Sequence, residues 1–345
     1  MKKLVSLLLC AVLCLSLLSA AAVAESTPSV AIVVAGGLGD RSFYDSANEG
    51  LETLASKYGT VTKVIECKED GSLYLTGLAE AAESCDVVFA VGWQFEQALP
   101  EAADGYPEKK FVWIDNALVE GKDNVMSVVY AQNQGSFLAG AAAAMLTTRT
   151  EIPGINENKI IGWVGGMDIP VLHDFYVGYE QGAKYIDPDI QVMQSFAGTW
   201  NDPLKGKELT LSQYALGADV VMNVASGTGN GVLEGAKEAG RFAIGVDLNQ
   251  DGDQPGSVFT SMVKRVDTAC YLLIESVVNG TFEGGITEYL DIEKGGVSLT
   301  DMSVVKEYLG DQFPEDILEK VAELEAKIIS GEIVVDNYEG FGPAK

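Results

Sequence analysis

The sequence predicts an α/β protein made of two doubly wound parallel-sheet lobes joined by a hinge. Short β-branched and aromatic runs alternate with helical stretches at intervals of roughly 20–30 residues, which is typical of right-handed βαβ units. The alternation occurs twice, once before and once after an alanine-rich helix at Gly135–Thr147. A chain of 345 residues also exceeds the roughly 250 residues at which one core usually divides into two domains.

The first 24 residues are expected to be a secretory signal peptide that is removed before folding. Lys2 and Lys3 precede an apolar run over residues 4–20, and residues 22–24 offer a small-x-small cleavage site. A retained membrane anchor is the alternative, but the apolar run is short and no stop-transfer pattern follows it. The two cysteines of the leader lack the small neighbouring residue of a lipid-attachment motif. We therefore expect a periplasmic or extracellular protein, and whether it associates with the outer face of the cell membrane stays open.

The first lobe begins after this leader, and its strands are expected to be buried because they are short and rich in β-branched residues. The predicted strands are Val30–Ala35, Val61–Cys67, Asp86–Val91, Lys110–Asp115 and Val125–Tyr130, with helices at Phe43–Tyr58 and Tyr74–Ser84. Residues 28–131, joined by about 258–290, are assigned to this lobe.

The second lobe repeats the same alternation and takes residues 132–257 together with about 291–345. The predicted strands of this second series are Ile160–Val164, Gln191–Ala197, Asp219–Ala225, Phe242–Val246 and Val258–Val263. Its predicted helices are Leu172–Tyr185, Leu204–Leu216, Gly231–Ala239 and Val266–Asn279. The last strand and the last helix of the series fall in the segment 258–290 that is assigned to the first lobe. The tail is less periodic and is expected to pack across this lobe, with a helix at Glu315–Ile329 and a late strand at Glu332–Val335.

The net charge of −27 argues against nucleic acid as a partner, because an acidic surface repels phosphate backbones. The single histidine, His173, excludes a multi-histidine metal site and disfavours a Ser-His-Asp enzyme. Cys67, Cys85 and Cys270 are odd in number and have no metal-like spacing, although one bridge between the first two is conceivable.

Polar and aromatic residues gather where the predicted strands end, which is where open α/β sheets bind their ligands. The glycine-rich segment 36–43 opens the first helix, with Ser42 as a candidate N-cap, but its spacing is not that of a dinucleotide-binding loop. Asp115 ends the fourth strand and either caps a turn or meets a ligand donor. In the loop 198–203, Asp202 is an expected N-cap before proline, whereas Trp200 has little core to join.

Two later loops complete this set. Residues 226–231 form a flexible turn with several hydrogen-bond donors. Residues 247–253 match the first seven positions of an EF-hand-like calcium loop, but the twelfth position is Val258, where a bidentate glutamate is required. We therefore expect no metal at this loop.

Taken together, these loops resemble the basic membrane protein (BMP) family of substrate-binding proteins, the purine-nucleoside receptors with a type I periplasmic-binding fold. The resemblance extends from about Val30 to Val297. It implies a receptor that captures a ligand for an ABC importer, with a membrane permease as partner, no cofactor and no enzymatic activity. Its most specific segments are Gly39–Phe43, Phe111–Asp115, Gln134–Gly140, Gly198–Lys207, Gly245–Asp247 and Ser261–Lys264.

The resemblance implies a purine base sandwiched between one aromatic ring from each lobe. The matching positions are Phe43 and Trp200, and because the family usually has phenylalanine at the second, Trp200 widens the stacking surface. By the same resemblance, Asp115 accepts hydrogen bonds from the base, while Asp247 and Lys264 hold the ribose hydroxyls.

Four further positions are assigned to the site. Backbone donors around Gly227 and Gly229 are expected beside the sugar by the same resemblance. Asp40 and Asp45 are expected to line the site because they lie next to the first aromatic position in sequence. The chain departs from the family pattern at Asn249, where an aspartate is common, and in the absent lipid-attachment cysteine.

Other functions remain open at this point. The same fold can bind another heterocycle, such as a flavin, or a sugar. It can also serve as a ligand-sensing ectodomain. A nucleoside hydrolase is the alternative from the enzyme class, and it would use the carboxylates Asp40, Asp45, Asp251 and Asp253.

Overall fold

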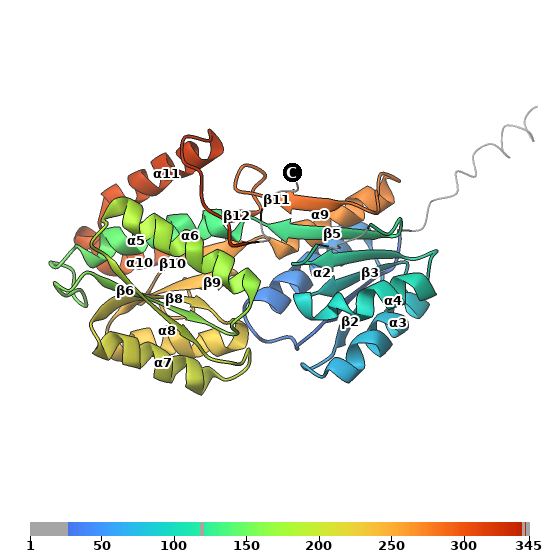
Figure 1. The fold of residues 1–345 in the computed structure, drawn as a ribbon, viewed down its shortest axis with the longest axis horizontal. Coiled ribbons are helices and arrows are strands. Elements are labelled where there is room, and N and C mark those ends of the chain that lie inside the picture. The colour runs from blue at the N-terminus through green and yellow to red at the C-terminus, as the bar shows by residue number, and fades with distance from the viewer. Residues whose placement is uncertain (1–26, 118–120, 340–341, 343–345) are drawn as a thin grey trace, which may run out of the picture.

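The computed structural model describes residues 27–117, 121–339 and 342, which form two α/β lobes lying side by side (Figure 1). These residues build two six-stranded sheets, in the orders β11-β5-β4-β3-β1-β2 and β12-β10-β9-β8-β6-β7. The strands pair in parallel except at β10 and β12, which are antiparallel. The predicted class of two doubly wound lobes is confirmed, whereas the predicted signal peptide lies outside the described residues.

The first lobe contains one sheet and the helices packed on it. Its inner strand β1 is buried along its whole length between the edge strand β2 and β3, as expected for a parallel strand made of a continuous apolar run. The strands are β1 (Val30–Val34), β2 (Thr62–Glu66), β3 (Val87–Val91), β4 (Lys110–Ile114), β5 (Val125–Tyr130) and β11 (Thr287–Leu290), and the α-helices are α2 (Phe43–Tyr58), α3 (Tyr74–Ser84), α4 (Ala98–Gly105) and α9 (Val266–Val278).

The second lobe contains the other sheet and the C-terminal helices, which lie at its outer side (Figure 1). The strands are β6 (Ile160–Gly165), β7 (Gln191–Phe196), β8 (Ala218–Val224), β9 (Phe242–Asp247), β10 (Val258–Lys264) and β12 (Val297–Leu299). The α-helices are α5 (Gln132–Thr147), α6 (Pro170–Ile186), α7 (Pro203–Ala215), α8 (Gly229–Ala239), α10 (Ser303–Leu309) and α11 (Glu315–Ile329). Short 3-10 helices at Gly71–Leu73, Trp93–Glu96, Ser226–Thr228 and Gly310–Gln312 complete the described helical turns.

The chain returns to the first lobe later than the sequence predicted. Residues 258–264 were assigned to the first lobe, but β10 pairs with β9 and β12 in the second sheet. The crossing comes at the end of β10, and α9 then packs on α2 of the first lobe. The predicted strand at 332–335 is also wrong, since that segment is irregular. Its apolar side chains Ile333 and Val335 are buried without entering a sheet.

Glycines allow helices α5 and α6 to pack with their backbones in close approach. A Cβ atom at Gly178 would overlap the carbonyl oxygen of Asn133, and one at Gly182 would overlap that of Phe137. Gly140 stands in the same relation to Tyr179 on the facing helix. Glycines on both helices therefore allow this close packing in the second lobe.

Gly178→Ala is expected to lower the free energy of unfolding by about 1–3 kcal/mol, the usual cost of forcing extra atoms into a packed core. Gly105→Ala is the control, because a Cβ atom at Gly105 meets nothing within 4 Å. Urea unfolding monitored by circular dichroism measures both. A loss below about 0.5 kcal/mol for Gly178→Ala would show that the two helices separate easily.

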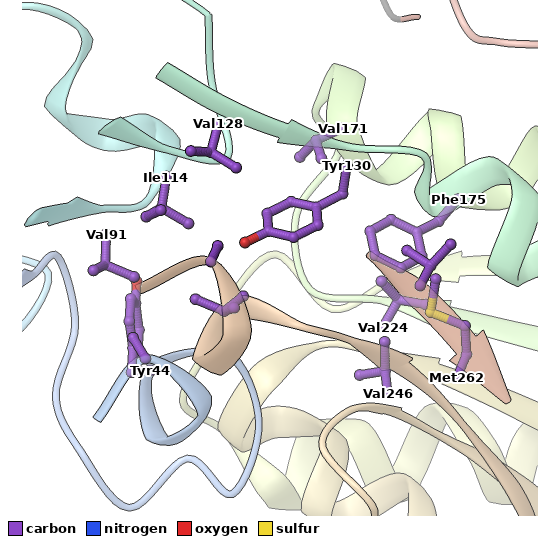
Figure 2. Close-up of a cluster of buried hydrophobic side chains, with 14 of the residues drawn as sticks. Tyr44, Val91, Ile114, Val128, Tyr130, Val171, Phe175, Val224, Val246 and Met262 are labelled. Carbon is purple, nitrogen blue, oxygen red and sulfur yellow. The ribbon is translucent and has the colours of Figure 1, made fainter. Parts of the chain in front are cut away.

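The hydrophobic core continues from one lobe into the other. Figure 2 shows Tyr130 between a group from the first lobe, including Ile114 and Val91, and a group from the second lobe around Phe175 and Val246. The two lobes are therefore packed against each other through buried apolar side chains. Cys67, Cys85 and Cys270 are buried free thiols, so the conceivable Cys67–Cys85 bridge is absent. Among the described helices, none has the length and apolar character needed to cross a bilayer.

Candidate functional site

A pocket lies between the two lobes, at the carboxyl ends of strands from both sheets. Strands β3 and β4 of the first lobe lead into it, as do β8, β9 and β10 of the second. This is the position that doubly wound sheets use for ligands. The lining residues are Phe43, Tyr44, Gly92, Trp93, Gln94, Asp115, Val171, Leu172, Phe175, Trp200, Val224, Ala225, Ser226, Asp247 and Lys264.

The pocket brings together five residues that the sequence analysis assigned to a site, and they come from both lobes. Phe43 is the first residue of α2, and Asp115 follows β4. Trp200 lies in the loop between β7 and α7 of the other lobe. Asp247 ends β9, and Lys264 ends β10. One aromatic ring from each lobe thus faces a common cavity that also holds two carboxylates and one ammonium group.

Lys264 is the electrostatic centre of this pocket. It is 1% exposed, and its Nζ donates to Oδ1 of Asp115 across the interface between the lobes. The same Nζ lies 5.4 Å from the ring centroid of Phe43, 5.0 Å from that of Tyr130 and 5.3 Å from that of Phe175. A buried ammonium group requires such partners, because it has lost its hydration. The lysine therefore ties β4 and α2 of one lobe to α6 of the other.

Asp247 is the second carboxylate of the pocket and is also buried. Burial raises its pKa to about 6, against the opposing effects of the nearby Lys264 ammonium and a hydrogen bond from Ser42. The Ser42 hydroxyl donates this bond from the first lobe. The charge of Asp247 is therefore held at a cost in free energy that its neighbours only partly offset.

Asp40 caps the first helix, a role that the sequence analysis had given to Ser42 as a candidate. Its carboxylate accepts the backbone N–H groups of Ser42, Tyr44 and Asp45, whereas the Ser42 side chain makes no capping bond. Asp40 also accepts the Ser226 hydroxyl from the second lobe at 2.7 Å. Burial is the largest influence on Asp40 and raises its pKa.

All four of the other assigned positions lie outside the pocket's lining. Two of them, Asp40 and Gly227, line a neighbouring hollow that contains the glycine loop 36–39. Asp45 accepts the backbone N–H groups of Gly39 and Arg41, so its carboxylate shapes this loop. The N–H of Gly229 is bonded to carbonyls of the preceding 3-10 turn. Because that donor is already used, Gly229 is not an N–H donor to a ligand in this arrangement.

Three residues that line the pocket have left-handed backbone conformations. Asp115 has φ 75°, Asp247 has φ 64° and Ser226 has φ 50°. Non-glycine residues rarely adopt positive φ, and strained residues of this kind gather at ligand sites. Each of the three follows or ends a strand, so the strain turns the chain sharply at the edge of the sheet.

The lobes are closed upon each other through polar contacts that surround the pocket. Arg41 of the first lobe pairs with Asp253 of the second, and its carbonyl accepts from Gln250 Nε2 at 2.8 Å. Asn230 Nδ2 donates to the carbonyl of Asp40 at 3.2 Å. Within the loop 247–253 the acidic side chains have different partners, since Asp253 pairs with Arg41 and Asp251 accepts from the Ser261 hydroxyl.

Several lining residues were not predicted as site residues. Trp93 and Gln94 form a 3-10 turn after β3, where Gly92 adopts φ 123°. Phe175 reaches the pocket from α6, and Ser226 from the turn after β8. The strand-end rule that found Asp115 applies equally to Gly92–Gln94 and was the available signal. Phe175 gave no such signal, since an aromatic residue on a helix is usually core.

A family model for PnrA-like ABC transporter substrate-binding proteins matches residues 27–339 of this chain. The chain is 33% identical to the ABC transporter nucleoside-binding protein BmpA of Lactococcus lactis, covering 87% of this chain and 86% of that protein. It is 32% identical to a CD4+ T-cell-stimulating antigen of Listeria monocytogenes, over 87% and 85% of the two chains.

Solved structures show the same architecture. The crystal structure of a solute-binding protein of an ABC transporter system from Aeropyrum pernix superimposes with a TM-score of 0.80 at 30% identity, covering 90% of this chain and 94% of that chain. A second solute-binding protein, from Conexibacter woesei, gives a TM-score of 0.72 at 22% identity and supports the fold alone. The expected type I periplasmic-binding fold is thereby confirmed.

Proposed function

We propose that this chain, which belongs to the Bmp family of PnrA-like ABC transporter substrate-binding proteins, is exported and captures a purine nucleoside by closing its lobes around the base. It then delivers the nucleoside to a membrane permease. The observation that carries this proposal is the pair of aromatic residues, Phe43 and Trp200, which come from different lobes and line one pocket. A relative at 33% identity is named as a nucleoside-binding protein, which supports the same ligand class.

The charges of the pocket favour a neutral ligand with several hydroxyl groups. Asp115 and Asp247 outnumber the single ammonium of Lys264, so a phosphate group would meet net repulsion. A carboxylate accepts from hydroxyl groups in charge-assisted bonds that are stronger than neutral ones. In this proposal Asp247 and Lys264 hold the ribose. Asp115 shares its lone pairs between Lys264 and the base edge, because a carboxylate accepts several donors.

The two rings suit a flat base. Aromatic pairs add about 0.5–1.5 kcal/mol beyond the area that they bury, and a base enclosed between two rings gains this on both faces. Opening and closing of the lobes about the segments that join them would admit and enclose the ligand. No step of this process needs a nucleophile or a general base, which agrees with membership of a family of binding proteins.

Trp200→Ala is expected to weaken nucleoside binding by roughly 1–3 kcal/mol, the scale of one lost base–aromatic stack. Isothermal titration with adenosine, guanosine, inosine and the pyrimidine nucleosides measures the affinity of each. Tyr308→Ala is the control, because this tyrosine is 70% exposed and lies outside the pocket. Unchanged affinity in Trp200→Ala would place the indole outside the ligand site, and a wild-type protein that binds no nucleoside would refute the proposal.

Another heterocycle or a sugar is the competing ligand class for the same pocket. Protein purified without added ligand, then heated, releases any bound small molecule for identification by mass spectrometry. A nucleoside in the supernatant supports the proposal, and a flavin or a sugar replaces it. Incubation with nucleosides tests the hydrolase alternative, because only an enzyme would produce free base with time.

A further inference from the structure

Trp200 rests against a glycine of its own lobe. Gly166 follows β6, and a Cβ atom placed on it would lie 2.5 Å from Cζ3 and 3.1 Å from Cδ2 of the Trp200 indole. Ordinary van der Waals contact begins at about 3.4 Å. Any side chain at position 166 would therefore push the six-membered ring of the indole away by about 1 Å.

The backbone around this contact has little freedom to yield. The N–H of Gly166 donates to the carbonyl of Val224 at 2.9 Å. Its carbonyl accepts from the N–H groups of Gly198 and Thr199 at 2.7 Å and 3.0 Å. These bonds hold the first residue after β6 between β8 and the loop that carries Trp200. The overlap caused by an added methyl group would therefore be relieved by movement of the indole, because hydrogen bonds hold both the N–H and the carbonyl of the glycine.

The loop on the other side of the indole is fastened as well. The carbonyl of Trp200 accepts from the N–H of Thr228 at 2.9 Å, and the Thr228 hydroxyl donates to the carbonyl of Thr199 at 3.1 Å. The same hydroxyl accepts the N–H of Asp202 at 2.8 Å. Because these bonds hold the main chain of the loop, we expect the indole itself to yield, by moving away from Gly166.

The indole stands between this glycine and the cleft. Trp200 lines both the pocket and the neighbouring polar hollow, whereas Gly166 lines neither of them. The ring is thus in contact with Gly166, while Trp200 also lines the pocket that Phe43 lines from the other lobe. The closer the indole lies to Gly166, the more room is left in the pocket for a ligand.

We propose that Gly166 is a positioning residue that sets the width of the ligand gap by letting Trp200 lie back against the second lobe. The inference deepens the proposed function: the gap admits one flat aromatic ring system and excludes ring systems with bulky groups out of their plane. Gly166 touches no ligand itself. It acts through Trp200, so removal of the indole must abolish its influence.

A double-mutant cycle with adenosine, guanosine and inosine as ligands tests this dependence. Gly166→Ala is expected to weaken binding of whichever nucleoside the wild type binds by at least about tenfold, since stacking is lost when the gap narrows. In the Trp200→Ala background the same substitution is expected to change affinity by less than about twofold. An equal loss in both backgrounds would overturn the proposal, because Gly166 would then act independently of the indole.

A second measurement needs no ligand and separates this inference from the proposed function. The near-ultraviolet circular dichroism of Trp200 is obtained by subtracting the spectrum of each Trp200→Ala protein from that of its parent. Gly166→Ala should alter this difference spectrum, and the control Gly105→Ala should leave it unchanged. An unaltered spectrum in Gly166→Ala overturns the inference even if nucleosides bind. A wild type that binds no nucleoside refutes only the proposed function.

The cycle also covers the case in which Gly166→Ala fails to fold. Thermal unfolding of the single and double variants then replaces the titration. Recovery of a folded protein in Gly166→Ala/Trp200→Ala supports the contact between the added methyl group and the indole. An unfolded double variant overturns it, because the methyl group would then clash with atoms other than those of Trp200.

Discussion

Replacing Lys264 with methionine is expected to lower the free energy of unfolding by about 3–5 kcal/mol, the cost of removing one partner from a buried ion pair. Methionine fills a similar volume but carries no charge. Asp115 loses its ammonium partner, and Asp247 loses the nearby positive charge that opposes the effect of its burial. The same variant is expected to lose measurable nucleoside binding. Chemical unfolding at pH 7 and calorimetric titration measure the two effects.

Two further variants test this explanation. Lys294→Met removes an ion pair whose lysine side chain is 50% exposed, and exposed pairs contribute about 0–1 kcal/mol. The double variant Lys264→Met/Asp115→Asn is expected to regain part of the lost stability, since asparagine accepts the positive φ of position 115 and leaves no buried charge there. A loss below about 1 kcal/mol in Lys264→Met alone would show that water reaches Asp115.

The sequence was sufficient to predict the two lobes because their strands are buried on both faces. Such strands are short apolar runs, and β5 and α2 begin and end at the predicted residues. The assignment of β10 to the first lobe was wrong for the same reason, because an apolar run of this kind fits the sheet of either lobe. Periodicity tells which residues form a strand. It does not tell which of two similar sheets receives that strand.

The site was predictable where function lies at a strand end and not where it depends on tertiary pairing. Asp115 was found because it follows a strand, and Asp247 and Lys264, which the resemblance supplied, each end a strand, so the rule for open sheets explains why the three lie together. The pairing of Lys264 with Asp115 joins residues 149 positions apart, and nothing in their local sequence indicates it. Asp40 and Asp45 lie near Phe43 in sequence but bind backbone N–H groups of their own loop.

Buried charge in the cleft opposes stability, and a ligand site gives a reason for its presence. Asp40 and Asp247 both have raised pKa values because burial disfavours their ionised forms. Both also accept a hydroxyl from the opposite lobe when the lobes are closed. A buried carboxylate lowers the stability of the folded protein, but it can accept hydrogen bonds from ligand hydroxyls. Binding and stability therefore conflict at such a residue.

Asp247→Asn is therefore expected to stabilise the protein at pH 7 by up to about 3 kcal/mol while weakening nucleoside binding about tenfold or more. A folded pKa of about 6, above the ordinary value of 3.8, means that the unfolded state ionises first as the pH rises. The contribution of Asp247 thus lowers the stability of the wild type between about pH 4 and pH 6, and the variant lacks this contribution. Below pH 4 the two proteins should be equally stable, because the protonated aspartic acid carries no charge.

Asp174→Asn is the matched control for this last variant. Asp174 is also buried, burial raises its pKa to about 6, and it lies outside the lining of the pocket. It accepts from Gln132 Nε2 and from the N–H of Tyr338, both within the second lobe. Relative to the wild type, Asp174→Asn should change the pH dependence of stability as much as Asp247→Asn does, but its nucleoside affinity should equal that of the wild type. Equal losses of affinity in the two variants would contradict this explanation. They would mean that any buried carboxylate in this region affects closure of the lobes, and that Asp247 makes no contact of its own with the ligand.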